Sequence, residues 1–189
     1  MKHIKLLAIL FISTLTFTAC SDDDETNPEP EHEEELITTM KIILTPKSGN
    51  GAVIFTSTDL DGDGGEDPKI VAPNLAANTT YKGSITLLNE NESPADDITV
   101  EVNEEAEEHQ FFYIVKDLNS TFTYTGQKDA NNNPIGIDFE LNTGKKGSGS
   151  YTFILRHEPN KTAEGVSNND ITNAGGETDI EAVFDVTIE

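Results

Sequence analysis

The chain reads LITTMKIIL at residues 36–44 and AVIFTST at residues 52–58. Both stretches are rich in β-branched residues, which fit the pleated, half-buried surface of a sheet. The dipeptide Asn50-Gly51 lies between them and favours the tight turn of a two-stranded hairpin. The two stretches therefore predict an antiparallel hairpin at the start of a β-rich domain.

Short stretches of similar composition recur along the rest of the chain. Each is rich in aromatic or β-branched residues and bounded by Gly, Asn or Pro, and they lie at 69–71, 79–88, 110–115, 120–126, 134–142, 150–157 and 180–188. About eight short strands with hairpin signals are typical of an antiparallel β-sandwich. We therefore predict a mainly β domain over residues 36–189, an Ig-like sandwich with one short helix.

The predicted helix covers residues 95–108. Ser93 suits the capping position before a helix, and Pro94 suits its first turn. From Ile98 onward an apolar residue recurs every four positions, which would give one apolar helical face. Residues 98–102 also fit a short strand, and that alternative stays open.

The amino-terminal segment has the layout of an export signal. Lys2 and Lys5 precede an apolar run of about a dozen residues, which suits a secretory signal and is too short to span a bilayer. The run ends in Phe17-Thr18-Ala19-Cys20, which resembles the bacterial lipobox. Cys20 is the only cysteine, so an internal disulfide is impossible and acylation explains the thiol. We predict a signal peptide over residues 1–19 and a membrane anchor through lipid on Cys20.

An acidic tether is predicted after the anchor, over residues 20–35. Its composition is too polar to bury a core. Its first part, Ser21-Asp22-Asp23-Asp24-Glu25, looks like the surface-export signal of Bacteroidetes lipoproteins. We therefore expect an outer-membrane protein, displayed on the cell surface in preference to the periplasmic leaflet. The net charge of −23 disfavours nucleic acid as a partner and attracts cations.

Four segments of the domain carry a resemblance that runs from about Glu33 to the end of the chain. They read DLDGDG at 59–64, AEEHQFF at 106–112, RHEPNK at 156–161 and NAGGETDI at 173–180. The domain thereby resembles uncharacterised flavobacterial lipoproteins commonly labelled type 1 periplasmic-binding-fold proteins. That label implies a two-lobed α/β structure, for which this chain lacks both the length and the βαβ alternation. The resemblance also implies, by analogy, service to a TonB-dependent outer-membrane receptor.

An acidic loop after the first hairpin is the sharpest local motif. Asp59, Asp61 and Asp63 alternate ahead of a glycine, as in the first half of an EF-hand loop, where carboxylates converge on Ca²⁺. Ile70 stands where a closing Glu belongs, although Glu66 or Asp67 is near enough to substitute. The motif therefore predicts either a Ca²⁺ site or a plain hydrated turn.

Three histidines are the other candidate metal ligands. His32 lies in the acidic tether, which could bind Zn²⁺ or another borderline cation. We expect His109 at a helix C-terminus, where a cationic imidazole is favoured. We expect His157 at a strand end, exposed to solvent unless it serves as a ligand. A Zn²⁺ site requires several of these residues to converge, which a sequence alone does not show.

Catalytic signatures are missing from the sequence. It contains no Gly-x-Ser-x-Gly elbow, no phosphate-binding Gly-Lys-Ser loop and no dinucleotide fingerprint, so we do not expect an enzyme. We expect a lipoprotein that binds a cation or a metal-bearing ligand. The alternatives are a structural or adhesive surface module and a polysaccharide-binding module. The last requires an exposed aromatic row drawn from Phe111, Phe112, Tyr113, Phe122, Tyr124 and Tyr151.

Overall fold

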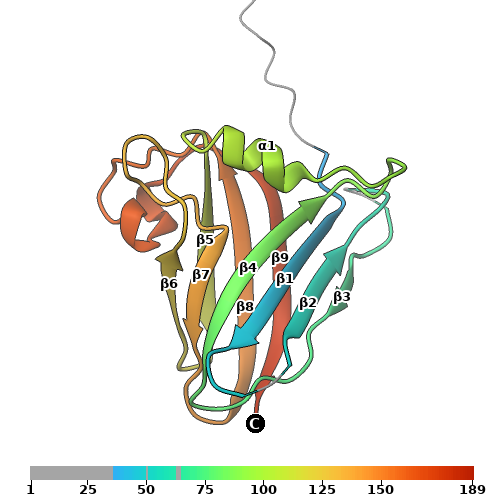
Figure 1. The fold of residues 1–189 in the computed structure, drawn as a ribbon, viewed down its shortest axis with the longest axis vertical. Coiled ribbons are helices and arrows are strands. Elements are labelled where there is room, and N and C mark those ends of the chain that lie inside the picture. The colour runs from blue at the N-terminus through green and yellow to red at the C-terminus, as the bar shows by residue number, and fades with distance from the viewer. Residues whose placement is uncertain (1–35, 50, 63–64) are drawn as a thin grey trace, which may run out of the picture. The chain divides into compact units, whose positions relative to one another are not determined.

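Two antiparallel sheets face each other in the computed structural model, which describes residues 36–49, 51–62 and 65–189 (Figure 1). The larger sheet has the strand order β3-β2-β1-β4-β7-β6, and the smaller has the order β5-β8-β9. The elements are β1 (Thr39–Pro46), β2 (Val53–Thr58), β3 (Lys69–Val71), β4 (Thr80–Leu88), α1 (Ile98–Glu104), β5 (His109–Lys116), β6 (Thr121–Thr125), β7 (Asp138–Asn142), β8 (Gly147–His157), the 3-10 helices η1 (Val166–Asn168) and η2 (Ile171–Asn173), and β9 (Glu177–Ile188). The predicted antiparallel β-sandwich is confirmed. The predicted signal peptide, Cys20 and the tether lie outside the described residues.

The predicted hairpin forms as β1 and β2. Its register places Ile42 of β1 opposite Phe55 of β2. Strand β4 pairs with the other edge of β1 and places Ile85 opposite Ile42. Met40, Ile42 and Leu44 are fully buried and alternate with less buried residues. Because side chains alternate between the two faces of a strand, this spacing turns one face of the larger sheet toward the core.

Aromatic rings from both sheets fill the space between them. The ring centroids of Phe55 and Phe184 of β9 lie 5.4 Å apart, and those of Phe139 of β7 and Phe153 of β8 lie 5.8 Å apart. Phe139 pairs with Gly83 of β4, where a Cβ atom would overlap its ring. Burial of these large apolar surfaces is the main source of stability in such a core.

The segment between β8 and β9 packs on the outer face of the smaller sheet. A second apolar cluster holds it there: Phe112, Ile154, Val166 and Ala174. Asn169 of the same segment forms two hydrogen bonds with the backbone of the edge strand β5. Its Oδ1 accepts a hydrogen bond of 2.8 Å from the Tyr113 backbone N–H, and its Nδ2 donates one of 2.7 Å to the Tyr113 carbonyl oxygen. The free backbone groups of an edge strand are thereby satisfied at this point.

Helix α1 is shorter than predicted and lies over one end of the sandwich (Figure 1). Asp97 caps it, and the prediction of Ser93 at the cap was wrong. Ile98 and Val102 are buried as the four-residue repeat predicted. The prediction of His109 at a helix C-terminus was wrong, because α1 ends at Glu104 and the chain turns into β5 at His109. The turn brings this predicted ligand to the same end of the sandwich.

Candidate metal centre

Two histidines meet across neighbouring strands at the end of the smaller sheet. His109 opens β5 and His157 closes β8, and the two are direct cross-strand partners. Residues directly opposite one another project on the same face, and here the ring centroids lie 4.7 Å apart. The expectation of an exposed His157 was wrong: its side chain is 11% exposed, because β8 is the central strand of the sheet, and the His109 side chain is fully buried.

Asp179 completes the cluster from β9. The β8–β9 register pairs Leu155 with Ile180 but Arg156 with Thr178, so Asp179 is an extra residue in the ladder. A β-bulge of this kind re-aims a side chain. The Asp179 carboxylate is 4% exposed and faces both rings, with Oδ2 3.6 Å from Nε2 of His109 and Oδ1 3.5 Å from Nδ1 of His157.

The three side chains have the spacing of a cation site. One ligand atom from each of His109, His157 and Asp179 lies within 4.8 Å of the other two. In a tetrahedral Zn²⁺ site with metal–ligand bonds of about 2.0–2.1 Å, neighbouring ligand atoms are about 3.3 Å apart. Small side-chain rotations would therefore close the three atoms around one ion. Two imidazoles and one carboxylate leave a fourth position for water or another ligand.

The surroundings of His109 orient its ring. Its Nδ1 lies 3.3 Å from the carbonyl oxygen of Glu105, at the end of α1, and 4.0 Å from the carboxylate of the same residue. An N–H on Nδ1 satisfies that carbonyl and leaves the lone pair of the imidazole on Nε2, toward Asp179. Metal-binding histidines usually have a partner of this kind on the nitrogen that does not bind the ion.

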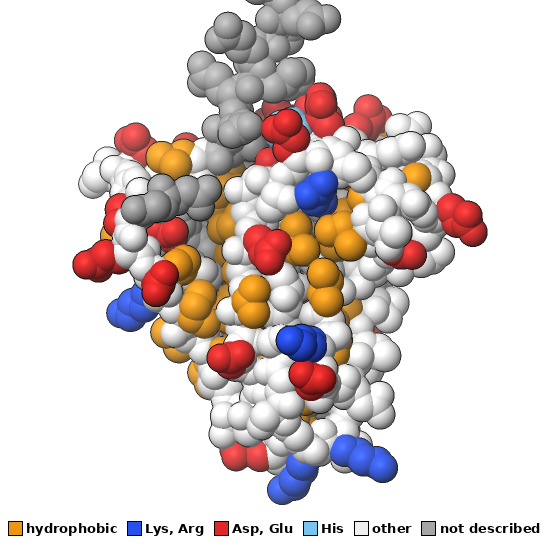
Figure 2. Space-filling view, turned by 180° about the vertical axis from the view of Figure 1, so that it is seen from behind, with side chains coloured by type: hydrophobic (Ala, Val, Ile, Leu, Met, Phe, Trp, Pro, Cys, Tyr) orange, Lys and Arg blue, Asp and Glu red, His pale blue; other side chains and the backbone are white. Residues whose placement is uncertain are grey.

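A second group of possible ligands lies at the rim and shares His157. Glu108, His157 and Glu158 each offer one ligand atom within 4.8 Å of the others. The Glu108 side chain is 39% exposed, but its Oε2, which lies 4.0 Å from Nε2 of His157, is buried, whereas Glu158 is exposed. Figure 2 shows histidine surface among acidic side chains at this end of the domain. The site therefore has a buried part and a rim open to solvent.

The acidic loop behaves as a hydrogen-bonded turn where it is described. Asp59 Oδ1 accepts a bond of 2.9 Å from the Gly62 N–H, and Asp61 Oδ2 accepts one of 2.8 Å from the Glu66 N–H. Among the residues with described positions, neither these two nor Asp67 joins a group of three clustered ligands. Asp63 and His32 lie outside the described residues, so the structure brings together only His109 and His157 of the predicted ligands.

Asp179, Glu108 and Glu158 are the site residues that sequence reasoning missed. Asp179 is an even number of positions from Glu181 and Asp185 on β9, and both of those residues face solvent. Strand alternation alone therefore predicts that Asp179 faces solvent as well. Only the register shift between β8 and β9 turns it inward. The sequence holds one weak signal, an acidic residue next to each predicted histidine in Glu108-His109 and His157-Glu158.

The six candidate aromatic residues, all of which the structure describes, form no exposed row. Phe111, Phe112, Tyr113 and Tyr151 are buried. Phe122 and Tyr124 of β6 are half-buried and line an open depression of about 690 Å³. Its other walls are mostly polar and include Lys128 and the Asn131–Asn133 turn.

In comparisons with known proteins, no family model, curated protein or solved structure matches this chain. Within the described part of the chain, no helix is long and apolar enough to cross a membrane.

Proposed function

We propose that this protein is an outer-membrane lipoprotein that binds a divalent transition-metal cation at His109, His157 and Asp179. The single observation that supports the site is the convergence of two buried imidazoles and one buried carboxylate, with nitrogen-to-oxygen separations of 3.5 and 3.6 Å. A cation bound at this point would place positive charge beside the buried carboxylate, which favours its ionised form.

The ligand types favour a borderline metal over Ca²⁺. Ca²⁺ takes six to eight oxygen ligands, whereas imidazole nitrogen suits Zn²⁺, Cu²⁺ and Ni²⁺. With two nitrogens and one oxygen, the site is expected to bind Cu²⁺ more tightly than Zn²⁺, following the general order of divalent affinities. Zn²⁺ suits the tetrahedral arrangement that the three ligands allow.

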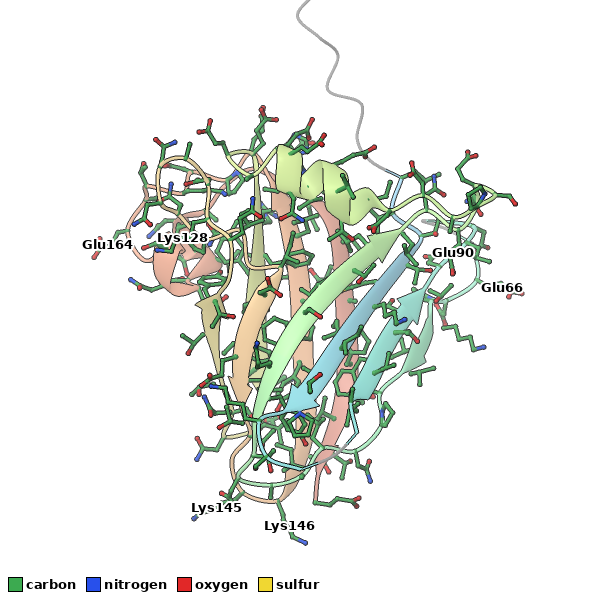
Figure 3. The ribbon with its side chains drawn as sticks, viewed as in Figure 1. Glu66, Glu90, Lys128, Lys145, Lys146 and Glu164 are labelled. Atoms are coloured by element: carbon green, nitrogen blue, oxygen red, sulfur yellow. The ribbon has the colours of Figure 1, made fainter. Side chains whose placement is uncertain are left out.

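The charge of the domain supports capture of cations. Acidic side chains gather at the α1 end around the histidine surface in Figure 2. Lys145 and Lys146 lie at the opposite end of the sandwich (Figure 3). A surface of one sign raises the local concentration of the opposite ion and speeds its association.

The anchor and the partner complete the proposal. Lipidation of Cys20 would hold the site at the outer membrane, facing the cell exterior, and a TonB-dependent receptor is the partner that the resemblance implies. In this role the protein collects an ion and performs no catalysis. Fractionation of cells that express the Cys20→Ala variant tests the anchor: the wild-type chain should sediment with membranes and the variant should not.

Calorimetric titration of the purified chain with Zn²⁺ and Cu²⁺ tests the metal site. All proteins should carry Cys20→Ala, because a free thiol binds both metals. We expect one ion per chain with a dissociation constant on the order of micromolar or lower. Asp179→Asn should weaken binding at least about tenfold. Wild-type-like binding by Asp179→Asn, or no binding by the parent chain, would contradict the proposal.

Two matched variants make that titration specific. Asp185→Asn removes the same charge from an exposed position on β9 and should leave the affinity unchanged. His32→Asn removes the histidine of the acidic tether, so retained binding excludes the tether as the source of the signal. Binding that disappears with His32→Asn and persists in His157→Asn would assign the ion to the tether instead.

A further inference from the structure

The two ring nitrogens of His157 face different carboxylates. Nδ1 lies 3.5 Å from Asp179 Oδ1 on the buried side, and Nε2 lies 4.0 Å from Glu108 Oε2 on the rim side. His157 therefore belongs to two ligand groups, an inner one with His109 and Asp179 and an outer one with Glu108 and Glu158.

Exposure differs sharply between the two groups. The inner carboxylate of Asp179 is 4% exposed, whereas the Glu108 side chain is 39% exposed with its Oε2 buried, and Glu158 is open to solvent. The backbone brings the outer acids together, because the Glu158 N–H donates a hydrogen bond of 2.6 Å to the Glu108 carbonyl oxygen. That bond continues the β5–β8 pairing one step beyond the two histidines.

The chemistry of imidazole limits how the two groups can be used. A neutral ring has one lone pair and one N–H, so a cation on one nitrogen leaves the other nitrogen as a donor. With the ion inside, Nδ1 is the ligand and Nε2–H points to Glu108. With the ion outside, Nε2 is the ligand and Nδ1–H points to Asp179. In both arrangements the ring nitrogen that does not bind the ion points its N–H toward a carboxylate, as is usual for histidine ligands in metal sites.

We infer that Glu108, His157 and Glu158 form a capture position through which the cation reaches the inner site. This inference rests on the proposed function. The ion first binds Nε2 of His157 and the two rim carboxylates, and then passes to Nδ1, His109 and Asp179. As it moves, the ring loses the proton on Nδ1 to bulk solvent and Nε2 takes one up from solvent at the rim, so the charge of the site is unchanged. The two positions share one lone pair, and the chain holds one ion at a time.

Zn²⁺ transfer from a chromogenic chelator to the full chain, followed by stopped flow, tests the inference. Glu158→Gln should keep one ion per chain and an equilibrium affinity within about threefold of the parent, while uptake and release both slow about tenfold. Glu164→Gln is the matched control, because it removes the same charge from an exposed residue of the same segment (Figure 3) and should leave the rates unchanged.

The outcomes distinguish failure of the capture position from failure of the proposed metal site. If Glu158→Gln and Glu164→Gln take up Zn²⁺ at the same rate, or if the parent chain binds two ions at once, the capture position is wrong and the inner site still stands. If the parent chain takes up no Zn²⁺, the proposed function fails and the capture position fails with it. Asp179→Asn should retain only a weak, fast-exchanging ion at the rim, and complete loss of binding in that variant counts against an outer position.

Discussion

Lys161 Nζ lies 3.5 Å from Asp129 Oδ2, and both side chains are almost entirely buried, at 4% and 1% exposure. Lys161 also donates hydrogen bonds to the carbonyl oxygens of Ala106 and Pro134. The ion pair therefore connects the segment after β8 to the turn between β6 and β7. The hydrogen bond to Ala106 connects the same segment to the chain just ahead of His109. Together these contacts support the strand ends that carry the proposed metal ligands.

Replacing Asp129 by Ala should destabilise the domain. The change leaves the Lys161 charge buried without its counter-charge, and removing one partner of a buried ion pair costs about 3 kcal/mol. Urea unfolding measures the loss. Lys128→Met is the control, because Lys128 is exposed in the same turn (Figure 3) and its loss should cost less than about 0.5 kcal/mol. Equal effects of the two variants would show that the buried pair has no special role.

Acid should remove the contribution of Asp129. Burial raises the pKa of this carboxyl group, but hydrogen bonds from Asn133 and Asn131 and the nearby charge of Lys161 outweigh burial and lower the pKa below its ordinary value. The unfolded chain then binds the proton more tightly than the folded chain. The stabilisation is therefore complete above the unfolded pKa of about 3.9 and is lost as the pH falls through the lower folded value.

Unfolding free energies measured from pH 6 downward check that sign. Below about pH 4, the free energy of the wild-type protein should fall more steeply with pH than that of Asp129→Asn. Parallel curves for the two proteins would mean that Asp129 titrates alike in the folded and unfolded states.

Gly83→Ala should lower the melting temperature. A Cβ atom at Gly83 would overlap the Phe139 ring across the β4–β7 pair, and overpacking of this kind costs about 1–3 kcal/mol. Gly147→Ala is the matched strand control, because its Cβ atom would lie 3.6 Å from Leu118 Cδ2, an ordinary contact. Combining Gly83→Ala with Phe139→Leu should recover part of the loss. No recovery would place the strain elsewhere.

Asn169→Gly should loosen the segment between β8 and β9. The variant keeps the left-handed backbone that Asn169 adopts at a φ of 71° but loses both hydrogen bonds to Tyr113. The cost is about 1–3 kcal/mol, and exchange of the Tyr113 amide hydrogen should accelerate. Asn132→Gly, at an exposed residue with a φ of 67°, should leave that amide protected. Unchanged protection in Asn169→Gly would contradict this role.

The sequence was sufficient to predict the strands because their signals are local. Met40, Ile42 and Leu44 show by spacing alone which face of β1 is buried. The helix start was mispredicted because Ser93-Pro94 is a generic capping signal, and only the structure shows that Asp97 accepts the first-turn hydrogen bond instead. Local propensity thus locates an element better than it locates its ends.

The candidate site depends on long-range register, which local patterns do not encode. His109 and His157 could be nominated singly from their neighbours, but their meeting requires the β5–β8 pairing. Asp179 requires the bulge between β8 and β9, because one extra residue reverses the face that alternation assigns to it. Topology, rather than motif, assembles this cluster.

X-ray absorption at the zinc edge of the Zn²⁺-loaded Cys20→Ala/His32→Asn protein tests the central claim most directly. We predict a first shell with two imidazole nitrogens at about 2.0–2.1 Å and one carboxylate oxygen, completed by water or a rim carboxylate. The imidazole scattering should fall by half in His109→Asn. A shell of oxygen atoms alone, or one unchanged by that substitution, would contradict a metal site at His109, His157 and Asp179.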